Sequence, residues 1–442
     1  MSAKSIDKLR FIMQSHLCSR CGSCVGLSEG KIVFKDREGD FRPFVVSEPS
    51  ESHASRLLYA CPGLDFNFKK FREEFYNEAP EFHLYTGPVY SINIAYSNDP
   101  LTRTTGASGG MISAILIWLL QKGKIDGAVV TGMSDEKPWL TKSFIATTAE
   151  QILAAAQSKY IITSVNEILP EIEKFNGRLA YVGLPSQVQS IRKLQSIGDP
   201  SVKNIDYIFG PFYGNTLHFS SIRNFLESYK IKDYQNISKL YFRHGEWPGN
   251  MRIEMNDGRV VQLPKFHANY LIPFHIMVNS LLCTDLSNEF TDISGGDAWA
   301  PIYEERGKGF SMVIARSEKG NQILNEMCES GVINMKPITI DEAITMHSHG
   351  YDLKKRGTFI RFKFRKLLGQ TNPDFGYEIK GFPFSRYLME FAIDALFLVA
   401  GTAPARWLVA QIPPDIVGSL FERTRKMWKK ATFGIKRDNL NQ

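Results

Sequence analysis

Residues 111–133, MISAILIWLLQKGKIDGAVVTGM, combine two patterns that decide the fold of the chain. Apolar residues recur at helical spacing in the first half, which predicts a helix, and the second half is a short apolar run typical of a buried strand. A strand is also predicted upstream, in VYSINIAYS at 89–97, and the order strand, turn, helix recurs in GRLAYVGLPSQVQSIRKLQ at 177–195. This alternation predicts an α/β fold with α+β elements.

Two later segments extend this core. NIDYIFGPFYG at 204–214 reads as another buried strand that ends in glycine. GNMRIEMNDGRVVQL at 249–263 places Asp257 and Gly258 between two alternating runs, and this dipeptide strongly favours a tight turn between antiparallel strands. The segment therefore predicts a β-hairpin.

The composition describes a folded protein with an uneven charge. The chain has 442 residues, of which 43% are hydrophobic, enough for two or three domains. Its first residues, MSAKSIDKLRFIMQSHLCSRC, contain no apolar core of a secretory signal, so we expect a cytoplasmic protein with reduced thiols. The net charge is +7, with +9 from Tyr351 to the end and −2 before it. No zinc finger or RNA-binding signature accompanies the basic end, so no nucleic-acid partner is expected.

Four of the six cysteines lie near the N-terminus. Cys18, Cys21 and Cys24 form a C-x2-C-x2-C run, and Cys61 is followed directly by Pro62. A run of this kind supplies three ligands of a 4Fe-4S cluster, and a remote cysteine before proline often supplies the fourth. The spacing predicts one such cluster. A structural zinc site that also uses His16 or His53 is the alternative.

A glycine-rich turn precedes the predicted helix at 111. In RTTGASGGMISAIL, residues 103–116, the small residues Gly106, Ser108, Gly109 and Gly110 leave backbone N–H groups accessible at the start of the helix. Such a place suits a phosphate or pyrophosphate group, although a tight turn into a helix needs no ligand. Because a single cluster carries one electron at a time, an enzyme that uses it usually has a second redox group, most commonly a flavin.

With these motifs in view, the chain resembles the beta-subunit family of coenzyme F420 hydrogenases and dehydrogenases. This family includes the 7-hydroxymethyl chlorophyll a reductases and the divinyl chlorophyllide reductases. The resemblance runs in order over most of residues 15–335. It is carried by CSRCGSCVGLSEGKIVF, ACPG, TTGASGGMISAILIWLLQKGKIDGAVV, QSKYIIT, AYVGLPSQVQSIRK, EWPGNMRI, CTDLSNEFTDISGGDAWAP and GKGFSMVIAR.

The resemblance implies an iron-sulfur flavoprotein oxidoreductase that contains FAD. Electrons would pass between reduced coenzyme F420 or ferredoxin and an unidentified acceptor or organic substrate. By this resemblance Thr105 to Gly110 lie against the flavin nucleotide, and Lys159, Tyr160 and Asp297 are cofactor-site residues. The alternatives are that Lys159 is a surface charge, that Asp297 caps a turn or helix, and that Trp299 belongs to the core. A non-catalytic electron-relay subunit and a relative with purely structural cofactors are the competing functions.

The departures from the family pattern limit the number of clusters. Many relatives have cysteine where this chain has Ser186, Gly210 and Ser280, and only Cys283 of that set is retained. Since neither serine nor glycine serves as a cluster thiolate, these positions predict one cluster and no second one. Cys328 lies in a helical pattern and is expected to pack in the core.

The resemblance and the patterns together divide the chain into four parts around a mixed-sheet flavin-binding core. We expect a ferredoxin-like iron-sulfur arm, two successive parts of the flavoprotein core, and a helical basic tail, with bounds of 1–80, 81–170, 171–345 and 346–442. In the tail, YLMEFAIDALFLVAG at 387–401 is interrupted by Glu390 and Asp394, which disfavours a membrane-spanning helix. The tail could dock on a partner subunit, on the anionic inner face of a membrane, or on the protein's own core.

Overall fold

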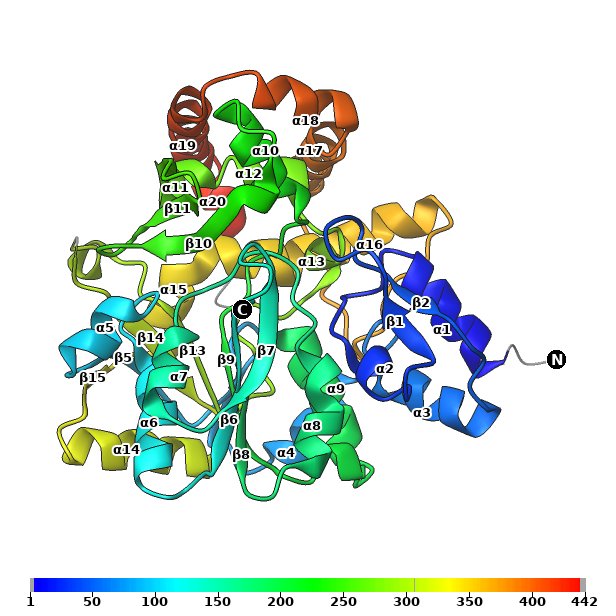
Figure 1. Ribbon diagram of the computed structural model, residues 1–442, viewed down its shortest axis with the longest axis vertical. Coiled ribbons are helices and arrows are strands. Elements are labelled where there is room, and N and C mark those ends of the chain that lie inside the picture. Colours follow the sequence, from blue (N-terminus) through cyan, green and yellow to red (C-terminus); the bar gives the residue numbers. More distant parts are fainter. Residues whose placement is uncertain (1–3, 306, 438–442) are drawn as a thin grey trace.

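The computed structural model describes residues 4–305 and 307–437. Its centre is an eight-stranded mixed sheet in the order β15-β5-β14-β13-β9-β8-β6-β7 (Figure 1). The four strands β13, β9, β8 and β6 are parallel to one another, and the outer pairs are antiparallel. The strands are β5 Ser91–Ser97, β6 Gly127–Met133, β7 Thr141–Ala146, β8 Leu179–Val182, β9 Ile205–Pro211, β13 Ile293–Asp297, β14 Ser311–Ala315 and β15 Ile333–Pro337.

Helices cover both faces of this sheet, as its buried parallel strands require. On one face, α6 (Met111–Gln121) and α14 (Glu318–Glu329) pack against Ala128 and Val130. On the other face, α8 (Leu169–Lys174) and α9 (Pro185–Gln195) cover Val129 and its neighbours. The predicted order of strand, turn and helix at 111–133 and at 177–195 is confirmed.

The N-terminal segment shares its core with the main sheet. It contains α1 (Ser5–Gln14), α2 (Ser23–Gly26), α3 (Glu51–Ala60) and α4 (Phe68–Phe75), with a small antiparallel pair of β1 (Ile32–Phe34) and β2 (Pro43–Val45). Leu9 and Leu57 pack in one apolar cluster with Val188 and Ile191 of α9. Figure 1 shows this blue segment at the side of the sheet, next to α9. The N-terminal segment is therefore packed against the main sheet and its helices and does not stand apart from them.

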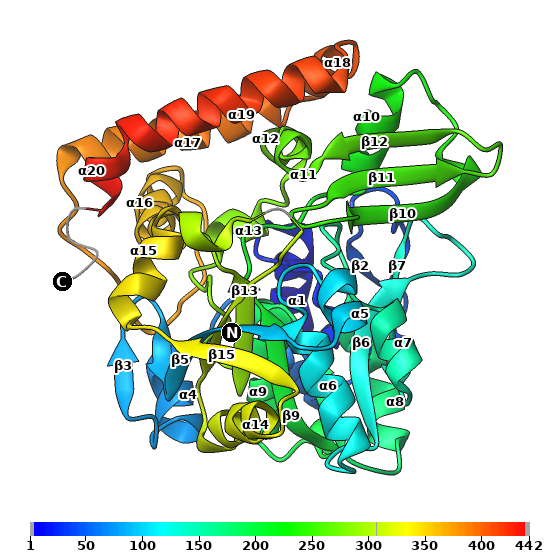
Figure 2. The same ribbon diagram turned by 90° about the vertical axis from the view of Figure 1, so that its left-hand side faces the viewer.

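A second sheet lies above the first, as Figure 2 shows. It consists of β10 (Ile237–His244), β11 (Asn250–Met255) and β12 (Val260–Pro264), all antiparallel. The predicted hairpin joins β11 to β12, and Gly258 in its turn has a φ of +84°, which favours glycine. Helices α10 (Ser220–Ser228), α11 (Lys265–Ala268) and α12 (Leu271–His275) pack on this sheet through a separate apolar cluster.

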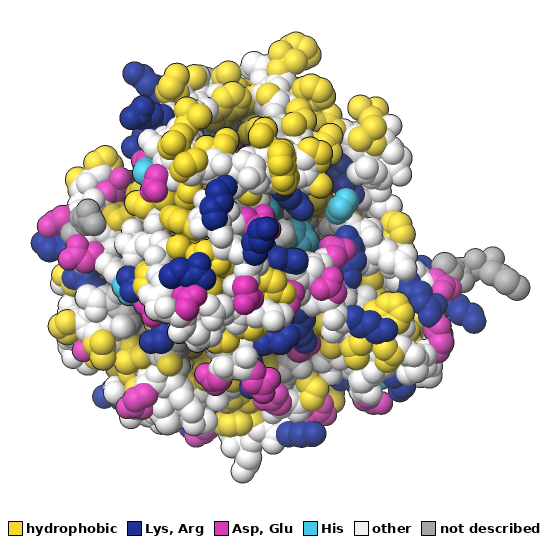
Figure 3. Space-filling model, turned by 45° about the horizontal axis from the view of Figure 1, so that its top comes forward, with side chains coloured by type: hydrophobic (Ala, Val, Ile, Leu, Met, Phe, Trp, Pro, Cys, Tyr) yellow, Lys and Arg dark blue, Asp and Glu magenta, His cyan; other side chains and the backbone are white. Residues whose placement is uncertain are grey.

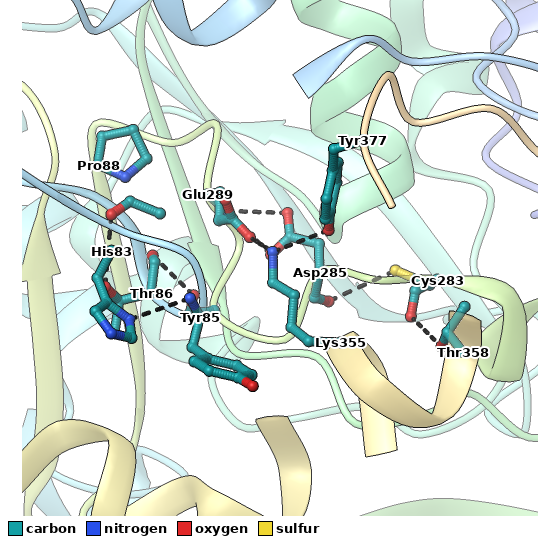
Figure 4. A network of polar contacts seen from close by, with 12 residues as sticks. His83, Tyr85, Thr86, Pro88, Cys283, Asp285, Glu289, Lys355, Thr358 and Tyr377 are labelled. Atoms are coloured by element: carbon teal, nitrogen blue, oxygen red, sulfur yellow. Dashed lines mark hydrogen bonds and ion pairs between the residues drawn. The ribbon is translucent and has the colours of Figure 1, made fainter. Parts of the chain in front are cut away.

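The C-terminal segment begins inside the protein. Helix α15 (Ile340–Tyr351) continues through a π-helical turn, Asp352–Gly357, into α16 (Thr358–Leu367). Part of the basic charge counted in the sequence is buried here: five cations are at most 4% exposed, and all but Lys354 form ion pairs, namely Lys354, Lys355, Arg356, Arg361 and Arg386. Figure 4 shows the Lys355 ammonium between Glu289 and Tyr377.

The surface part of the tail therefore begins later than the expected boundary at 346. Three helices form it, α17 (Phe384–Ala400), α18 (Ala403–Ala410) and α19 (Pro414–Ala431), and a short α20 (Phe433–Arg437) follows. Among residues 4–305 and 307–437, no single helix is both long and apolar enough to cross a membrane, and α17 and α18 meet that measure only as a pair bent by 74°.

Candidate functional site

A cavity of about 470 Å³ lies at the carboxyl ends of the parallel strands. Its floor is formed where β8, β9 and β13 end, at Val182, Pro211 and Asp297, and residues of the second sheet and its helices, including Phe242 and Lys265, form the opposite wall. In open α/β sheets ligands bind outside the carboxyl ends of the strands. The volume is within the range of small-molecule and cofactor sites. The position and the size both suit a cofactor.

The glycine-rich turn forms one edge of this cavity. Gly110 has a φ of +73°, and a Cβ atom there would lie 2.4 Å from the carbonyl oxygen of Thr102. At Gly106 a Cβ atom would lie 2.6 Å from the Cα atom of Gly110. The turn is therefore too tight for larger residues. Gly106, Ser108 and Gly110 line the cavity, together with the first residues of α6.

Two predicted residues of the turn do not line the cavity. The Thr105 hydroxyl donates a hydrogen bond to the carbonyl oxygen of Leu101 over 2.7 Å, inside the short helix α5 (Pro100–Thr105). The Gly109 N–H donates to the Ser311 hydroxyl over 2.9 Å, and a Cβ atom on Gly109 would lie 2.5 Å from the carbonyl oxygen of Ala95. Both residues therefore stabilise the turn through contacts on the side that faces away from the cavity.

Lys159 and Tyr160 lie side by side in the cavity wall. The Lys159 ammonium donates to the carbonyl oxygens of Ala156 at 2.7 Å and Gln157 at 3.1 Å, after the end of α7 (Ala149–Ala154). Burial lowers the pKa of Lys159 to about 7. It is thus a partly buried cation that holds a chain reversal, and the surface-charge alternative is wrong.

Tyr160 is surrounded by cations. The Lys265 ammonium lies 4.4 Å from the centre of its ring, and Arg243 donates to its hydroxyl over 3.2 Å. Burial alone would raise the pKa of the Tyr160 phenol, but Lys265 and Arg243 outweigh it, so that the pKa is lowered. The phenol oxygen thus lies among cations that favour its ionised form.

Asp297 is joined to Tyr160 through Arg243. The Arg243 guanidinium donates to both carboxylate oxygens of Asp297, at 3.1 and 3.3 Å, and to the carbonyl oxygen of Ala107 in the glycine-rich turn at 2.6 Å. The Trp247 indole N–H donates to the same carboxylate over 2.8 Å. Asp297 thus receives side-chain donors at the end of β13 and does not act as a helix cap. Trp299 is half-buried, packs against Trp247 and also lines the cavity.

The sequence reasoning missed Arg243 and Lys265. Arg243 comes from the end of β10 and is 3% exposed, and Lys265 begins α11 directly after β12. Both cations flank the hairpin that the sequence predicts, but nothing in their spacing indicates that the hairpin folds over the main sheet. His347 was also missed. Its ring Nε2 lies 2.9 Å from the Asp297 carbonyl oxygen, and burial lowers its pKa to about 4.

The four N-terminal cysteines line one small cavity of about 20 Å³. The Gly63 N–H donates to the Cys61 sulfur over 3.4 Å, and the Ser23 hydroxyl lies 3.4 Å from the Cys21 sulfur. Burial raises the pKa of the Cys61 thiol to about 12. No group of three or more His, Cys, Asp or Glu side chains in the described parts of the chain lies close enough to hold one metal ion. A 4Fe-4S cluster spreads its ligands over four irons and needs no such closeness.

One buried residue joins the two cavities. Asn166 donates from its backbone N–H to the Cys21 carbonyl oxygen over 2.9 Å, and from its side chain to the Ser23 hydroxyl over 2.8 Å and the Gln187 carbonyl oxygen over 3.1 Å. Gln187 lines the large cavity, as does Val165, the residue before Asn166. The path from Cys21 to the wall of the large cavity therefore consists of one hydrogen bond, from the Asn166 N–H, and the peptide link from Asn166 to Val165.

Two of the three positions at which the family resemblance implies a further cysteine, Gly210 and Ser280, are occupied by other contacts. At Gly210, a Cβ atom would lie 2.0 Å from the Asn288 side-chain nitrogen. The Ser280 hydroxyl lies 2.7 Å from the Tyr213 hydroxyl. Cys283 lies in the polar network of Figure 4, where its thiol donates to the carbonyl oxygen of Asp285. Cys328 packs half-buried against the core around α14, as expected.

Two family models match this chain. Both describe the beta subunit of coenzyme F420 hydrogenase/dehydrogenase: the model of its N-terminal part matches residues 92–170, and the model of its C-terminal part matches residues 176–341. Together they cover more than half of the chain.

Individual relatives carry related descriptions. The coenzyme F420-dependent sulfite reductase of Methanocaldococcus jannaschii is 26% identical over 347 residues, which are 75% of this chain and 49% of that protein. The chain thus spans about half the length of that relative. The coenzyme F420 hydrogenase subunit beta of Methanosarcina barkeri is 26% identical over 58% of this chain and 84% of its own length. One of the subunits of the F(420)H(2) dehydrogenase of Methanosarcina mazei is 26% identical over 71% of this chain and 83% of its own length.

A solved structure shares the fold. A chain of the F420-reducing NiFe hydrogenase complex from Methanosarcina barkeri, studied there as a xenon derivative, aligns with a TM-score of 0.52 and 24% identity. The alignment covers 66% of this chain and 98% of that chain. The likeness concerns the mixed α/β fold.

Proposed function

Because the chain belongs to the coenzyme F420 hydrogenase/dehydrogenase beta-subunit family, we propose that it is an iron-sulfur flavoprotein oxidoreductase. It uses FAD and one 4Fe-4S cluster to pass electrons between reduced coenzyme F420 or ferredoxin and an acceptor or organic substrate. The names of the relatives support coenzyme F420 as the partner. The observation that carries the proposal is the link through Asn166 between the four-cysteine cavity and the large cavity.

The residues of the large cavity fit a flavin nucleotide. The tight turn at Gly106 and Gly110 brings backbone close to the cavity without side chains in the way. N–H groups in the first turn of a helix lack partners within the helix and favour an anionic group. The amino groups of Lys159 and Lys265 lie in the same wall and can donate hydrogen bonds. We therefore assign this cavity to FAD, and the glycine-rich turn would hold its pyrophosphate.

The donor set of the small cavity fits an iron-sulfur cluster. Cys18, Cys21, Cys24 and Cys61 would be its ligands. Hydrogen bonds to cluster sulfurs tune the reduction potential, and the Gly63 N–H and the Ser23 hydroxyl are placed to donate them. The buried thiols are costly as free thiolates, so a bound cluster would explain why four of them share one apolar pocket.

When bound, FAD exchanges electron pairs with an organic donor and single electrons with a cluster, a conversion that side chains cannot perform. The chain's own residues bind and orient the reactants. Arg243 holds Asp297, Tyr160 and the glycine-rich turn in one arrangement. The Tyr160 phenol, whose pKa is lowered by Lys265 and Arg243, holds the proton that accompanies electron transfer.

A non-catalytic electron-relay subunit is the second candidate. The relatives named as subunits, and the apolar surface of α17 to α19, favour a chain that works attached to something else. Either role belongs in the cytoplasm, where thiols stay reduced. The attachment would then be to a partner subunit or to the inner face of a membrane.

The two roles separate in one experiment. Anaerobically purified protein is mixed with reduced coenzyme F420, reduced ferredoxin or NADPH, and the flavin absorbance is followed. Bleaching by coenzyme F420 or ferredoxin followed by turnover without another chain supports the enzyme, whereas bleaching without turnover favours the relay. No bleaching with either donor contradicts both. Tyr160→Phe should slow the reduction while FAD is retained, and Tyr234→Phe, whose hydroxyl contacts Glu38 away from the cavity, should not.

A further inference from the structure

The three helices α17, α18 and α19 present an apolar surface to solvent. Figure 3 shows hydrophobic side chains gathered over this end of the molecule. Phe384 and Leu398 are each 76% exposed, Met427 is 72% exposed and Trp407 is 66% exposed. The other large apolar residues exposed here are Leu388, Phe391, Leu396, Val399, Leu408, Ile412, Ile416, Leu420 and Trp428. A contiguous apolar surface of this extent marks an interaction site.

Buried charges hold α17 with this face outward. The residues at 384, 388, 391, 395 and 398 repeat at helical spacing on its outer side, while Arg386 and Glu390 point inward. The Arg386 guanidinium donates to Asp352 over 2.9 and 3.0 Å and pairs with Glu390 at 2.6 Å. Rotating the helix to bury its apolar side would expose apolar contacts and break these ion pairs, which is costly inside a protein.

Helix α19 is fixed in the same way. Gly418 faces α11 so closely that a Cβ atom would lie 2.6 Å from the His267 Cβ atom. The His267 ring nitrogen lies 3.2 Å from the Glu422 carboxylate on the same side. Ile416 and Leu420 are left outward, 61% and 64% exposed. The apolar surface is therefore built into the folded protein.

Cations border this surface on α19. Arg423, Lys426 and Lys430 are exposed within three helical turns beyond Leu420, and Figure 3 shows Lys and Arg side chains at the edge of the apolar area. On the outer side of α17 there is no charged residue, since Glu390 is buried and Asp394 is half-buried. Helices with an apolar face and nearby cations lie in the interface of anionic bilayers, where the cations meet lipid phosphates.

We propose that α17 to α19 dock the protein on the surface of an anionic lipid bilayer. The apolar side chains of the three helices enter the headgroup region, and Arg423, Lys426 and Lys430 contact lipid phosphates. The inference does not depend on the bound cofactors.

The test uses the full chain and sedimentation with vesicles of phosphatidylcholine, with and without phosphatidylglycerol. The protein should pellet with vesicles that contain phosphatidylglycerol, and less at high salt. Phe391→Glu combined with Leu398→Glu should weaken binding at least tenfold, which corresponds to about 1.4 kcal/mol. The matched control is Ile302→Glu, which replaces an apolar residue 74% exposed outside these helices and should bind like the parent.

A second variant tests the charge contribution. Changing Arg423, Lys426 and Lys430 to glutamine should remove the preference for phosphatidylglycerol and the salt dependence, while weak binding to phosphatidylcholine persists. Thermal unfolding of each variant like that of the parent establishes that it is folded. The proposal is overturned if the parent fails to sediment with anionic vesicles at low salt, or if the double glutamate variant binds as the parent does. It is likewise overturned if the same substitutions instead abolish a soluble complex with a protein partner.

Discussion

Arg243 is the residue on which the arrangement of the large cavity depends most. Its guanidinium donates to Asp297, to Tyr160 and to the carbonyl oxygens of Ala107 and Pro248. Arg243→Met keeps the length of the side chain and removes all of these bonds. Breaking a buried ion pair costs about 3–5 kcal/mol. Because Asp297 keeps the Trp247 indole and its side chain is 16% exposed, we expect the lower end, about 3 kcal/mol.

This loss can be measured by thermal unfolding. With about 2.1 cal/mol/K per residue, a chain of this length has an unfolding entropy of about 0.9 kcal/mol/K, so that about 3 kcal/mol lowers Tm by about 3 °C. The matched control is Arg252→Met on the neighbouring strand β11, where Arg252 pairs with Glu254 at 2.8 Å near the surface. That pair should contribute less than about 1 kcal/mol.

A double-mutant cycle tests the reason for the loss. Asp297→Asn removes the negative charge that Arg243→Met leaves unpaired, so the combined variant should lose less stability than the two single variants added together. We expect a coupling of about 1–3 kcal/mol between neighbours of this kind. If the losses add, the ion pair does not organise the cavity and the reasoning fails. FAD content measured on the same samples should fall in Arg243→Met and not in Arg252→Met.

Three further predictions concern the turn, the cysteines and pH. Gly110→Ala should lower both Tm and FAD content, because its Cβ atom meets the Thr102 carbonyl oxygen. The control Gly258→Ala, which has a similar φ but open space around it, should lower Tm by less and leave the FAD content unchanged. Equal effects of the two substitutions would count against a special role of the glycine-rich turn. Cys61→Ser should abolish bound iron and Cys283→Ser should retain it, as measured by iron analysis; loss of iron from both would contradict the assigned ligands. Burial lowers the pKa of His275 to about 3 and that of His218 to about 4, so both stay neutral in the folded protein while the unfolded chain takes up protons below about pH 6.5. The stabilisation that comes from keeping these histidines neutral should therefore be fully present above pH 6.5 and be lost as the pH falls towards 4. His275→Asn should reduce the difference in Tm between pH 7.5 and pH 5. An unchanged difference would show that His275 is not its cause.

The sequence predicts the local elements of the core well. The helix α6, the strands β6, β8 and β9, and the hairpin at Gly258 all follow from apolar spacing and turn residues, which are local signals. The glycine-rich turn was also identified, with Gly106, Ser108 and Gly110 at the cavity. The sequence does not distinguish Thr105 and Gly109 from these cavity residues. Only contacts with Leu101 and Ala95, which the sequence does not indicate, direct the two residues away from the cavity.

Long-range contacts account for what the sequence does not predict. Arg243 reaches Asp297 only because the second sheet folds over the first, and no periodicity records that arrangement. The expectation of a basic surface tail from residue 346 was affected for the same reason. Lys355 counts as surface charge in a sequence, yet it meets Glu289, 66 residues away, inside the core. The net charge of a segment therefore does not predict the charge of its exposed surface, because some of the charged side chains are buried.

The central claim is that one chain holds both an FAD and a 4Fe-4S cluster in electronic contact. A reductive titration of the anaerobically purified protein, followed by absorbance, tests it most directly. The account predicts uptake of about three electron equivalents per chain, two with bleaching of the flavin bands and one with loss of the broad iron-sulfur absorbance. Uptake of about two equivalents with flavin bleaching alone, or a colourless protein that takes up none, would contradict it.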